Sequence, residues 1–457
     1  MANAPRLTDG DRTFRDLNKN GRLDPYEDAR CSLEERVADL LGQMTLEEKA
    51  GLMFHTIAGV NLNGTLDPPQ QGPFRQPIAD AVTGKHLSHF NVHALPEPRL
   101  AARWYNRLQE LAEGTRLGIP ITISSDPRHA FAYNPLTSFA ATSLSQWPEP
   151  IGFGAVGDEA LVEQFGDIAR KEYIALGIRV ALHPMADLAT EPRWARISGT
   201  FGEDAAISAR LTAAYIRGFQ GTELGQYSVA CMTKHFPGGG PQMDGEDPHF
   251  AYGREQVYPG GQFDAHLIPF EAAFAAGTAQ IMPYYGMPIG TELEEVGFGF
   301  SKQVITEMLR ERYGFDGVVC TDWGLISNVH FGDRVMVARA WGVEHLSPID
   351  RLKKALDAGV DQFGGESCPE LMLELVRSGQ ISETRIDESA RRLLRDKFRL
   401  GLFDAAYLDE DAAERVVGNE AFRAAGALAQ RRASVLLKNG ELRGGPALPL
   451  HGAANLD

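Results

Sequence analysis

The sequence predicts an α/β fold, a (β/α)8 barrel of the TIM type, and three observations carry this prediction. Strand-like apolar runs alternate with amphipathic helical patterns, as they do in proteins with a parallel sheet. Roughly eight such units follow one another over about 330 residues, which suits a barrel with insertions. Ionisable or aromatic residues follow most of the strand-like runs, and this is where a barrel carries its functional groups.

The barrel is assigned to residues 32–380. Two capping boxes, Ser32 with Glu35 and Thr45 with Glu48, predict two helices before the first strand. The strand candidates lie near 51–57, 88–93, 120–124, 178–184, 228–233, 279–284, 317–321 and 360–363. The helical patterns between them include 97–117, 157–176, 204–220, 263–276, 301–312 and 350–358.

Ahead of the barrel, residues 1–31 form an arm that contains a calcium-loop pattern at 16–27. Gly21 stands where such a loop turns sharply. The ligand positions of the loop are filled by Asp16, Asn18, Asn20, Arg22, Asp24 and Glu27. The spacing predicts a structural Ca²⁺ that fastens the arm, and the alternative is a turn rich in Asp and Asn that binds nothing. No cofactor is predicted for catalysis.

After the barrel, residues 381–432 read as a helical linker, with helices predicted at 383–400 and 420–433. The apolar run 433–439 then reads as a β-strand, and a strand needs a sheet to join. We expect residues 433–457 to be the start of an α/β sandwich domain that is truncated. A second chain carrying the rest of that domain is therefore a candidate partner.

The composition excludes several classes of function. A net charge of −16 argues against nucleic acid as a partner. No run of about 18 apolar residues predicts a membrane span. The N-terminus has no apolar signal segment, so we expect a cytoplasmic location, although a mature exported protein would look the same. Four cysteines in a chain of this length indicate neither a disulfide framework nor a zinc site.

The candidate site consists of the residues that follow the predicted strands. The stretch 314–324 reads as a buried strand that stops at Asp322 and Trp323. The other strands lead to Asp126, Asp187, Arg196, Lys234, His235, Tyr284, Tyr285 and Glu366. Carboxylates and cations can bind the hydroxyl groups of a sugar, while aromatic rings cover its C–H faces. The set therefore predicts a carbohydrate pocket.

Several of these residues lie in motifs that resemble those of glycoside hydrolase family 3. The motifs are MTLEEK at 44–49, RWAR at 193–196 with FGED at 201–204, KHFPG at 234–238 and FDGVVCTDW at 315–323. The resemblance covers nearly the whole chain. Residues 434–439 and 448–450 also resemble the opening of the second, α/β sandwich domain of that family.

The resemblance implies retaining hydrolysis of β-glycosides. Asp322 matches the nucleophile that forms a covalent glycosyl-enzyme, and Trp323 would flank the sugar. The matching sugar-binding residues are Asp126, Arg196, Lys234, His235 and Tyr285. Retaining chemistry needs a second acid about 5 Å from the nucleophile, and the positive charges of Lys234 and Arg196 would keep Asp322 ionised.

The sequence leaves the general acid/base open. In the β-glucosidase branch it is commonly a Glu of the second domain, and this chain stops before any such position. In the β-N-acetylglucosaminidase branch the corresponding loop carries an Asp-x-His dyad, which Asp247 and His249 match. An Asp can orient a His and raise its pKa. The alternative is an acidic surface loop with an exposed His249.

Three functions fit these observations. The leading one is a retaining hydrolase that releases a terminal β-linked sugar from a small oligosaccharide or β-glycoside, of the β-glucosidase, exo-β-glucanase or β-xylosidase type. The second is a β-N-acetylhexosaminidase or phosphorylase that uses the Asp247–His249 dyad. The third is a non-catalytic glycan-binding subunit. A homo-oligomer is compatible with each of them.

Overall fold

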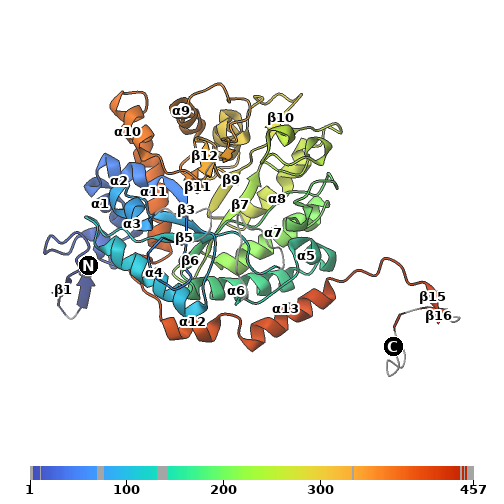
Figure 1. Cartoon of the computed structure of the whole chain (residues 1–457), viewed down its shortest axis with the longest axis horizontal. Helices are drawn as coiled ribbons and strands as arrows, with labels where there is room; N and C mark the ends of the chain where they lie inside the picture. Colours follow the sequence, from blue (N-terminus) through green and yellow to red (C-terminus); the bar gives the residue numbers. More distant parts are fainter. Residues whose placement is uncertain are drawn as a thin grey trace.

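Eight parallel strands form a single curled sheet that helices surround (Figure 1). The computed structural model describes residues 4–10, 12–68, 77–130, 143–331, 334–442, 445–446 and 448–449, and the eight strands are counted within these. In sheet order the strands are β11 (Val318–Val319), β9 (Gln280–Pro283), β7 (Ala230–Phe236), β6 (Ile178–Ala181), β5 (Thr122–Ser125), β4 (His89–Val92), β3 (Phe54–Ala58) and β14 (Phe363–Gly364). The predicted (β/α)8 barrel is confirmed.

The sheet closes into a barrel where β11 meets β14. Cys320 forms a parallel bridge with Gln362, and the Thr321 N–H donates to the Gln362 carbonyl at 2.9 Å. This seam lies directly before Asp322, so the closure of the barrel fixes where that carboxylate emerges.

A buried carboxylate lies beneath the seam. Asp361 is fully buried, and its Oδ2 accepts from the Val319 N–H at 2.9 Å and from the Arg310 guanidinium at 2.5 Å. Its Oδ1 accepts from the Ser389 hydroxyl at 2.9 Å and from Arg392 at 3.1 Å. Asp361 therefore joins the seam to two of the surrounding helices.

Most of the surrounding helices follow the predicted pattern, and both capping boxes form. The helices before and around the barrel are α1 (Leu33–Gln43), α2 (Leu46–Leu52), α3 (Ile78–Gly84), α4 (Pro98–Glu113), α5 (Pro150–Val156), α6 (Glu159–Ala175), α7 (Ala205–Gln220), α8 (Phe263–Ala275), the π-helix η6 (Gln303–Arg312), α9 (Pro348–Ala358), α10 (Pro369–Arg377) and α11 (Glu383–Arg399). Two more, α12 (Glu410–Val416) and α13 (Glu420–Arg432), run along one side of the barrel (Figure 1).

The loops contain short strand pairs and 3₁₀ turns. The two-stranded pairs are β1 (Arg6–Asp9) with β2 (Arg12–Arg15), β8 (Glu255–Gln256) with β10 (Met287–Pro288), β12 (Val329–Phe331) with β13 (Arg334–Met336), and β15 (Glu441–Leu442) with β16 (Gly445–Pro446). The 3₁₀ turns are η1 (Pro25–Glu27), η2 (Ile197–Gly199), η3 (Met243–Gly245), η4 (Ala251–Gly253) and η5 (Phe298–Phe300). No helix in the described part of the chain is both long and apolar enough to cross a membrane.

Three predicted strands differ clearly from the structure. The strand predicted at 360–363 is β14 at Phe363–Gly364. The apolar pattern places the first strand from residue 51, but the Thr45–Glu48 capping box starts a helix that continues to Leu52, so β3 begins only at Phe54. The strand predicted at 433–439 does not form, because no neighbouring strand lies beside this segment among the described residues to complete its hydrogen bonds. Its side chains Val435, Leu436 and Leu437 are exposed, and the segment leaves the barrel after α13 (Figure 1).

The N-terminal arm packs on the end of the barrel where the strands begin. The Lys19 ammonium donates to the carbonyls of Glu113 and Thr115, and the Tyr26 hydroxyl donates to the Leu117 carbonyl at 3.3 Å. These acceptors lie at the end of α4 and in the connection that precedes β5. The arm and its predicted calcium loop are therefore at the opposite end from the predicted carbohydrate pocket.

Candidate active site

Asp322 and His235 meet at the C-terminal ends of β11 and β7. Asp322 is buried, and its Oδ1 accepts from the Trp323 N–H at 2.7 Å. Its Oδ2 is also buried but has no hydrogen-bond partner among the described residues, and Nε2 of His235 lies 3.8 Å away. A buried carboxylate oxygen without a donor is costly, so it marks a position where a ligand group can be bound.

Lys234 and Asp126 form a second pair beside the first. The Lys234 ammonium donates to Oδ1 of Asp126 at 3.0 Å, and both side chains are largely buried. The Asn91 amide, at the end of β4, donates to Oδ2 of Asp126 at 3.3 Å. The sequence did not single out Asn91, because a buried Asn in a strand is indistinguishable from other polar residues until the neighbouring strand is placed beside it.

Asp187 holds His235 in one orientation. The His235 Nδ1–H donates to Oδ2 of Asp187 at 2.7 Å, and the His235 backbone N–H donates to Oδ1 at 3.2 Å. Burial lowers the pKa of His235 well below its usual range. Burial also raises the pKa of Asp187 to about 6, although the hydrogen bond from the Gly239 N–H acts to lower it. His235 is therefore neutral, with its proton on Nδ1 and an accepting Nε2 that faces Asp322.

Arg196 supplies a positive charge to the same region. Its guanidinium lies 5.9 Å from the ring centre of Tyr284 and 3.5 Å from the Tyr284 hydroxyl. Burial alone would lower the pKa of Arg196, but Tyr284, Asp247 and Asp322 raise it above its ordinary value. Arg196 thus stays charged close to the two carboxylates.

Tyr285 and Trp323 form one wall. The Tyr285 hydroxyl donates to the Trp323 carbonyl at 2.6 Å, and Arg339 donates to the same carbonyl at 3.2 Å. Gly365 has a φ of +72°, and a Cβ at this position would lie 2.8 Å from Cδ1 of Trp323, so a glycine is needed where β14 ends beneath the indole. Glu366, the next residue, accepts from backbone N–H groups of the loop after Trp323 and so holds that loop.

The Asp247–His249 dyad forms and is held by two buried tryptophans. Nδ1 of His249 is hydrogen-bonded to Oδ1 of Asp247. The Trp194 indole N–H donates to Oδ2 of Asp247 at 3.2 Å, and the Trp341 indole N–H donates to the Pro248 carbonyl at 2.8 Å. Although burial raises the pKa of Asp247, the hydrogen bond from His249 outweighs it and the pKa lies below the usual range.

The dyad belongs to the same site as Asp322. The His249 ring packs edge-on against Tyr285 with 4.8 Å between ring centres, and Tyr285 contacts the residue after Asp322. All nine residues predicted for catalysis and sugar binding therefore lie in this site. Sequence reasoning missed Asn91, Arg339 and Trp341; Trp341 and Arg339 lie in a long loop whose course the sequence does not determine.

The loop 16–27 closes on itself through its own side chains. Asp16 accepts from the N–H groups of Asn20 and Gly21, and Glu27 accepts from those of Leu17 and Asp24. No three His, Cys, Asp or Glu side chains in the described ranges gather closely enough to hold a metal on their own. A calcium ion here would need the amide oxygens of Asn18 and Asn20 and the Arg22 carbonyl; the two amide nitrogens donate to Asp24, so both amides would have to turn.

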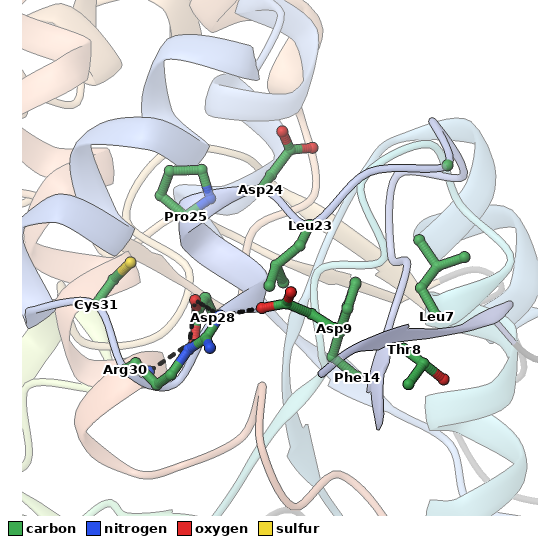
Figure 2. Close-up of a pocket in the computed structure, with 11 residues that line it drawn as sticks. Leu7, Thr8, Asp9, Phe14, Leu23, Asp24, Pro25, Asp28, Arg30 and Cys31 are labelled. Atoms are coloured by element: carbon green, nitrogen blue, oxygen red, sulfur yellow. Dashed lines mark hydrogen bonds and ion pairs between the residues drawn. The ribbon is translucent and has the colours of Figure 1, made fainter. Parts of the chain in front are cut away.

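A cavity of about 550 Å³ lies between the β1–β2 hairpin and this loop (Figure 2). Leu7, Phe14 and Leu23 line it, and Arg30 binds Asp28 at 2.7 Å and Asp9 at 2.8 Å beside it. The cavity is on the arm, at the opposite end of the barrel from Asp322. Of its acidic groups, Asp9 and Asp28 are paired with Arg30, and Asp24 accepts from the Asn18 and Asn20 amides. The cavity is therefore not part of the candidate active site.

Fold and site together define a (β/α)8-barrel protein with a cluster of buried polar and aromatic side chains at the ends of its strands. Residues 45–395 match the glycosyl hydrolase family 3 N terminal domain, and the chain belongs to that family. It is 53% identical over 425 residues to the probable beta-glucosidase C of Aspergillus oryzae, covering 93% of this chain and 66% of that protein. It is 41% identical over 473 residues to the periplasmic beta-glucosidase/beta-xylosidase of Dickeya chrysanthemi, covering 99% and 72%.

A solved structure has the same fold. A β-glucosidase from Erythrobacter marinus superposes with a TM-score of 0.75 and 25% identity, over 91% of this chain and 52% of that one. The chain thus spans 66% of the length of the Aspergillus relative and about half of the Erythrobacter one. The Dickeya relative is named as a periplasmic protein. The cytoplasmic location of this chain therefore stays a prediction.

The Asp187–His235 pair predicts a pH dependence. Above pH 6 the Asp187 carboxylate is ionised and accepts the Nδ1–H of His235, whereas protonation as the pH falls through about 6 removes that acceptor. We expect the affinity of this site for a sugar probe such as methyl β-glucoside to decrease by about tenfold per pH unit below that value. Titration calorimetry between pH 7.5 and 4.5 measures it, with Asp187→Asn as the variant that should lack this step. An affinity of the unaltered protein that stays constant to pH 4.5 contradicts the expectation.

Proposed function

We propose that this chain carries the sugar-binding and nucleophilic groups of a retaining β-glycosidase that releases a terminal β-linked glucose or xylose. The observation that carries the proposal is the Oδ2 of Asp322, which is buried and has no hydrogen-bond partner among the described residues. Nε2 of His235 lies 3.8 Å from it, and the charge of Arg196 interacts with this carboxylate. The names of the relatives, which are β-glucosidases and a β-glucosidase/β-xylosidase, support a glycoside as the substrate.

The chemistry follows from these groups. Oδ2 of Asp322 attacks the anomeric carbon while the glycosidic C–O bond breaks, and an acid protonates the departing oxygen. Water then releases the sugar from the resulting ester, and the same group takes the proton of that water. Lys234, Asp126 and the accepting Nε2 of His235 bind hydroxyl groups of the sugar, and Trp323 covers a C–H face.

Replacing the nucleophile tests the proposal. Asp322→Asn keeps the volume and removes the charge, so hydrolysis should fall by at least roughly 1,000-fold while the melting temperature changes little. The assay compares aryl β-glucoside, β-xyloside and β-N-acetylglucosaminide. Asp316→Asn is a matched control, because Asp316 is an exposed carboxylate paired with Arg392 and Arg395 outside the site. Wild-type rates in the Asp322 variant would contradict the assignment of Asp322 as the nucleophile.

A second candidate function is favoured by the formed dyad. Asp247 and His249 are the acid/base of a β-N-acetylhexosaminidase or phosphorylase in this alternative, and the two indole hydrogen bonds that hold them support it. In the first candidate the acid comes instead from a Glu of a sandwich domain, of which residues 433–457 are the proposed start, or of a second chain. If the protein binds sugars but hydrolyses none of them, the remaining function is that of a non-catalytic glycan-binding subunit.

Leaving groups separate these sources of the acid. If His249 protonates the departing oxygen, His249→Ala should slow substrates with poor leaving groups by about 100-fold and activated aryl glycosides far less. The ratio of the two rates measures this, with His249→Gln as a variant that keeps most of the volume. The same loss on both kinds of substrate assigns the acid to another group. Release of a sugar 1-phosphate that requires phosphate selects the phosphorylase.

We also propose that residues 16–27 bind a structural calcium ion. Each loop position can supply an oxygen, which calcium prefers, once the Asn18 and Asn20 amides turn, and Gly21 takes the left-handed backbone that the turn needs. The ion would fasten the arm to the start of the barrel strands, far from the chemistry.

Chelation tests the calcium proposal. Removing calcium with a chelator should lower the melting temperature by a few degrees and adding it back should restore the value, because an ion that binds only the folded state stabilises it. Glu27→Gln keeps an acceptor for the Leu17 N–H and should lose the response. A melting temperature that changes with neither chelator nor added calcium favours a turn that binds no metal ion.

A further inference from the structure

Two aromatic side chains lie exposed and stacked on the loop that carries the dyad. The rings of Phe250 and Tyr252 are 5.3 Å apart between centres with 5° between their planes, and both residues are more than half exposed. Phe250 follows His249 directly, and Tyr252 lies in the 3₁₀ turn η4. Large aromatic rings stacked on each other in water present an apolar surface that nothing in the proposed chemistry uses.

This surface is built on a fixed loop. The Phe250 N–H donates to the Asp247 carbonyl at 3.1 Å, and the Gly253 N–H donates to the Phe250 carbonyl at 3.0 Å. A Cβ at Gly253 would lie 2.4 Å from the Asp247 carbonyl oxygen, so the turn packs tightly against the dyad. The Trp341 hydrogen bond to Pro248 and the ion pair of Arg254 with Glu344, 3.1 Å long, attach both ends of the turn to the loop after β11.

Along this loop the side chains change from half-buried to exposed. Asp247 is half-buried and interacts with Arg196, and the His249 ring packs against Tyr285 in the pocket wall. Phe250 and Tyr252 come next along the chain and are exposed. A group bound in the pocket is attached to its aglycone on the solvent side, so the aglycone has to extend toward the exposed rim of the site.

We infer that Phe250 and Tyr252 form a binding subsite for the pyranose ring that leaves, the first sugar of the aglycone. The apolar C–H face of a pyranose stacks on an aromatic ring, and in a stacked pair each ring holds the other in the orientation that such a sugar needs. The subsite would favour β-linked di- and oligosaccharides over glycosides with small aglycones. This inference rests on the proposed function, because it takes the pocket around Asp322 to hold the sugar that is released.

Binding of two ligands tests the subsite. The first is an S-linked β-glucobiose, which resists hydrolysis and fills both the pocket and the aromatic surface, and the second is methyl β-glucoside, which fills the pocket alone. In Phe250→Ala/Tyr252→Ala, titration calorimetry should find the disaccharide bound about tenfold more weakly and methyl β-glucoside bound unchanged. Phe250→Tyr should bind both ligands as the unaltered protein does, because it keeps the ring.

A matched control distinguishes the loss of a subsite from the loss of any exposed ring. Tyr227→Ala removes another exposed tyrosine, in the connection that precedes β7 at the far end of the barrel, and should leave both affinities unchanged. Equal affinities of the double variant and the unaltered protein for the disaccharide overturn the subsite, and so does an equal loss for both ligands. An unaltered protein that binds neither ligand contradicts the proposed function itself.

Discussion

The carboxylate of Asp361 is the interaction on which the geometry of the site depends. β11 and β14 are each two residues long, so their backbone ladder alone offers few hydrogen bonds to close the barrel. Asp361 compensates by accepting from the Val319 backbone and from Arg310, Ser389 and Arg392. A buried charge is tolerated when it is paired and hydrogen-bonded in this way. The seam so closed delivers Asp322 three residues after Val319.

Buried charged groups at the two ends of the barrel differ in how completely they are hydrogen-bonded. At the ends where the strands begin, Asp361 is saturated with donors, and the buried Lys397 ammonium donates to Pro120 and Thr122. At the other end, Oδ2 of Asp322 has no donor among the described residues; the charge of Arg196 interacts with this carboxylate, and the Lys234 ammonium pairs with Asp126. Stability explains the first arrangement, and a bound ligand group would explain the second.

The sequence predicted what depends on local pattern and on motif. The strand alternation and the capping boxes fix the elements, and the strand ends name Asp126, Lys234 and Asp322. It failed where long-range contacts decide. The run 433–439 has the composition of a strand but no neighbour among the described residues, and the Trp341 indole reaches Pro248 from 93 positions away in the chain. Neither fact is encoded in the spacing of nearby residues.

The hydrogen bonds from the two tryptophans to the 247–253 turn involve its main chain and one carboxylate. Trp341 binds a carbonyl and Trp194 binds Asp247, so neither of these hydrogen bonds involves the imidazole of His249 or the exposed rings. The turn therefore keeps its shape whichever group supplies the proton. If the acid is His249, these hydrogen bonds position a catalytic group. If the acid lies elsewhere, the same hydrogen bonds still keep Phe250 and Tyr252 in place at the exposed edge of the site. The rigidity of the turn by itself thus speaks for a role in binding, and the proton donor is a separate question.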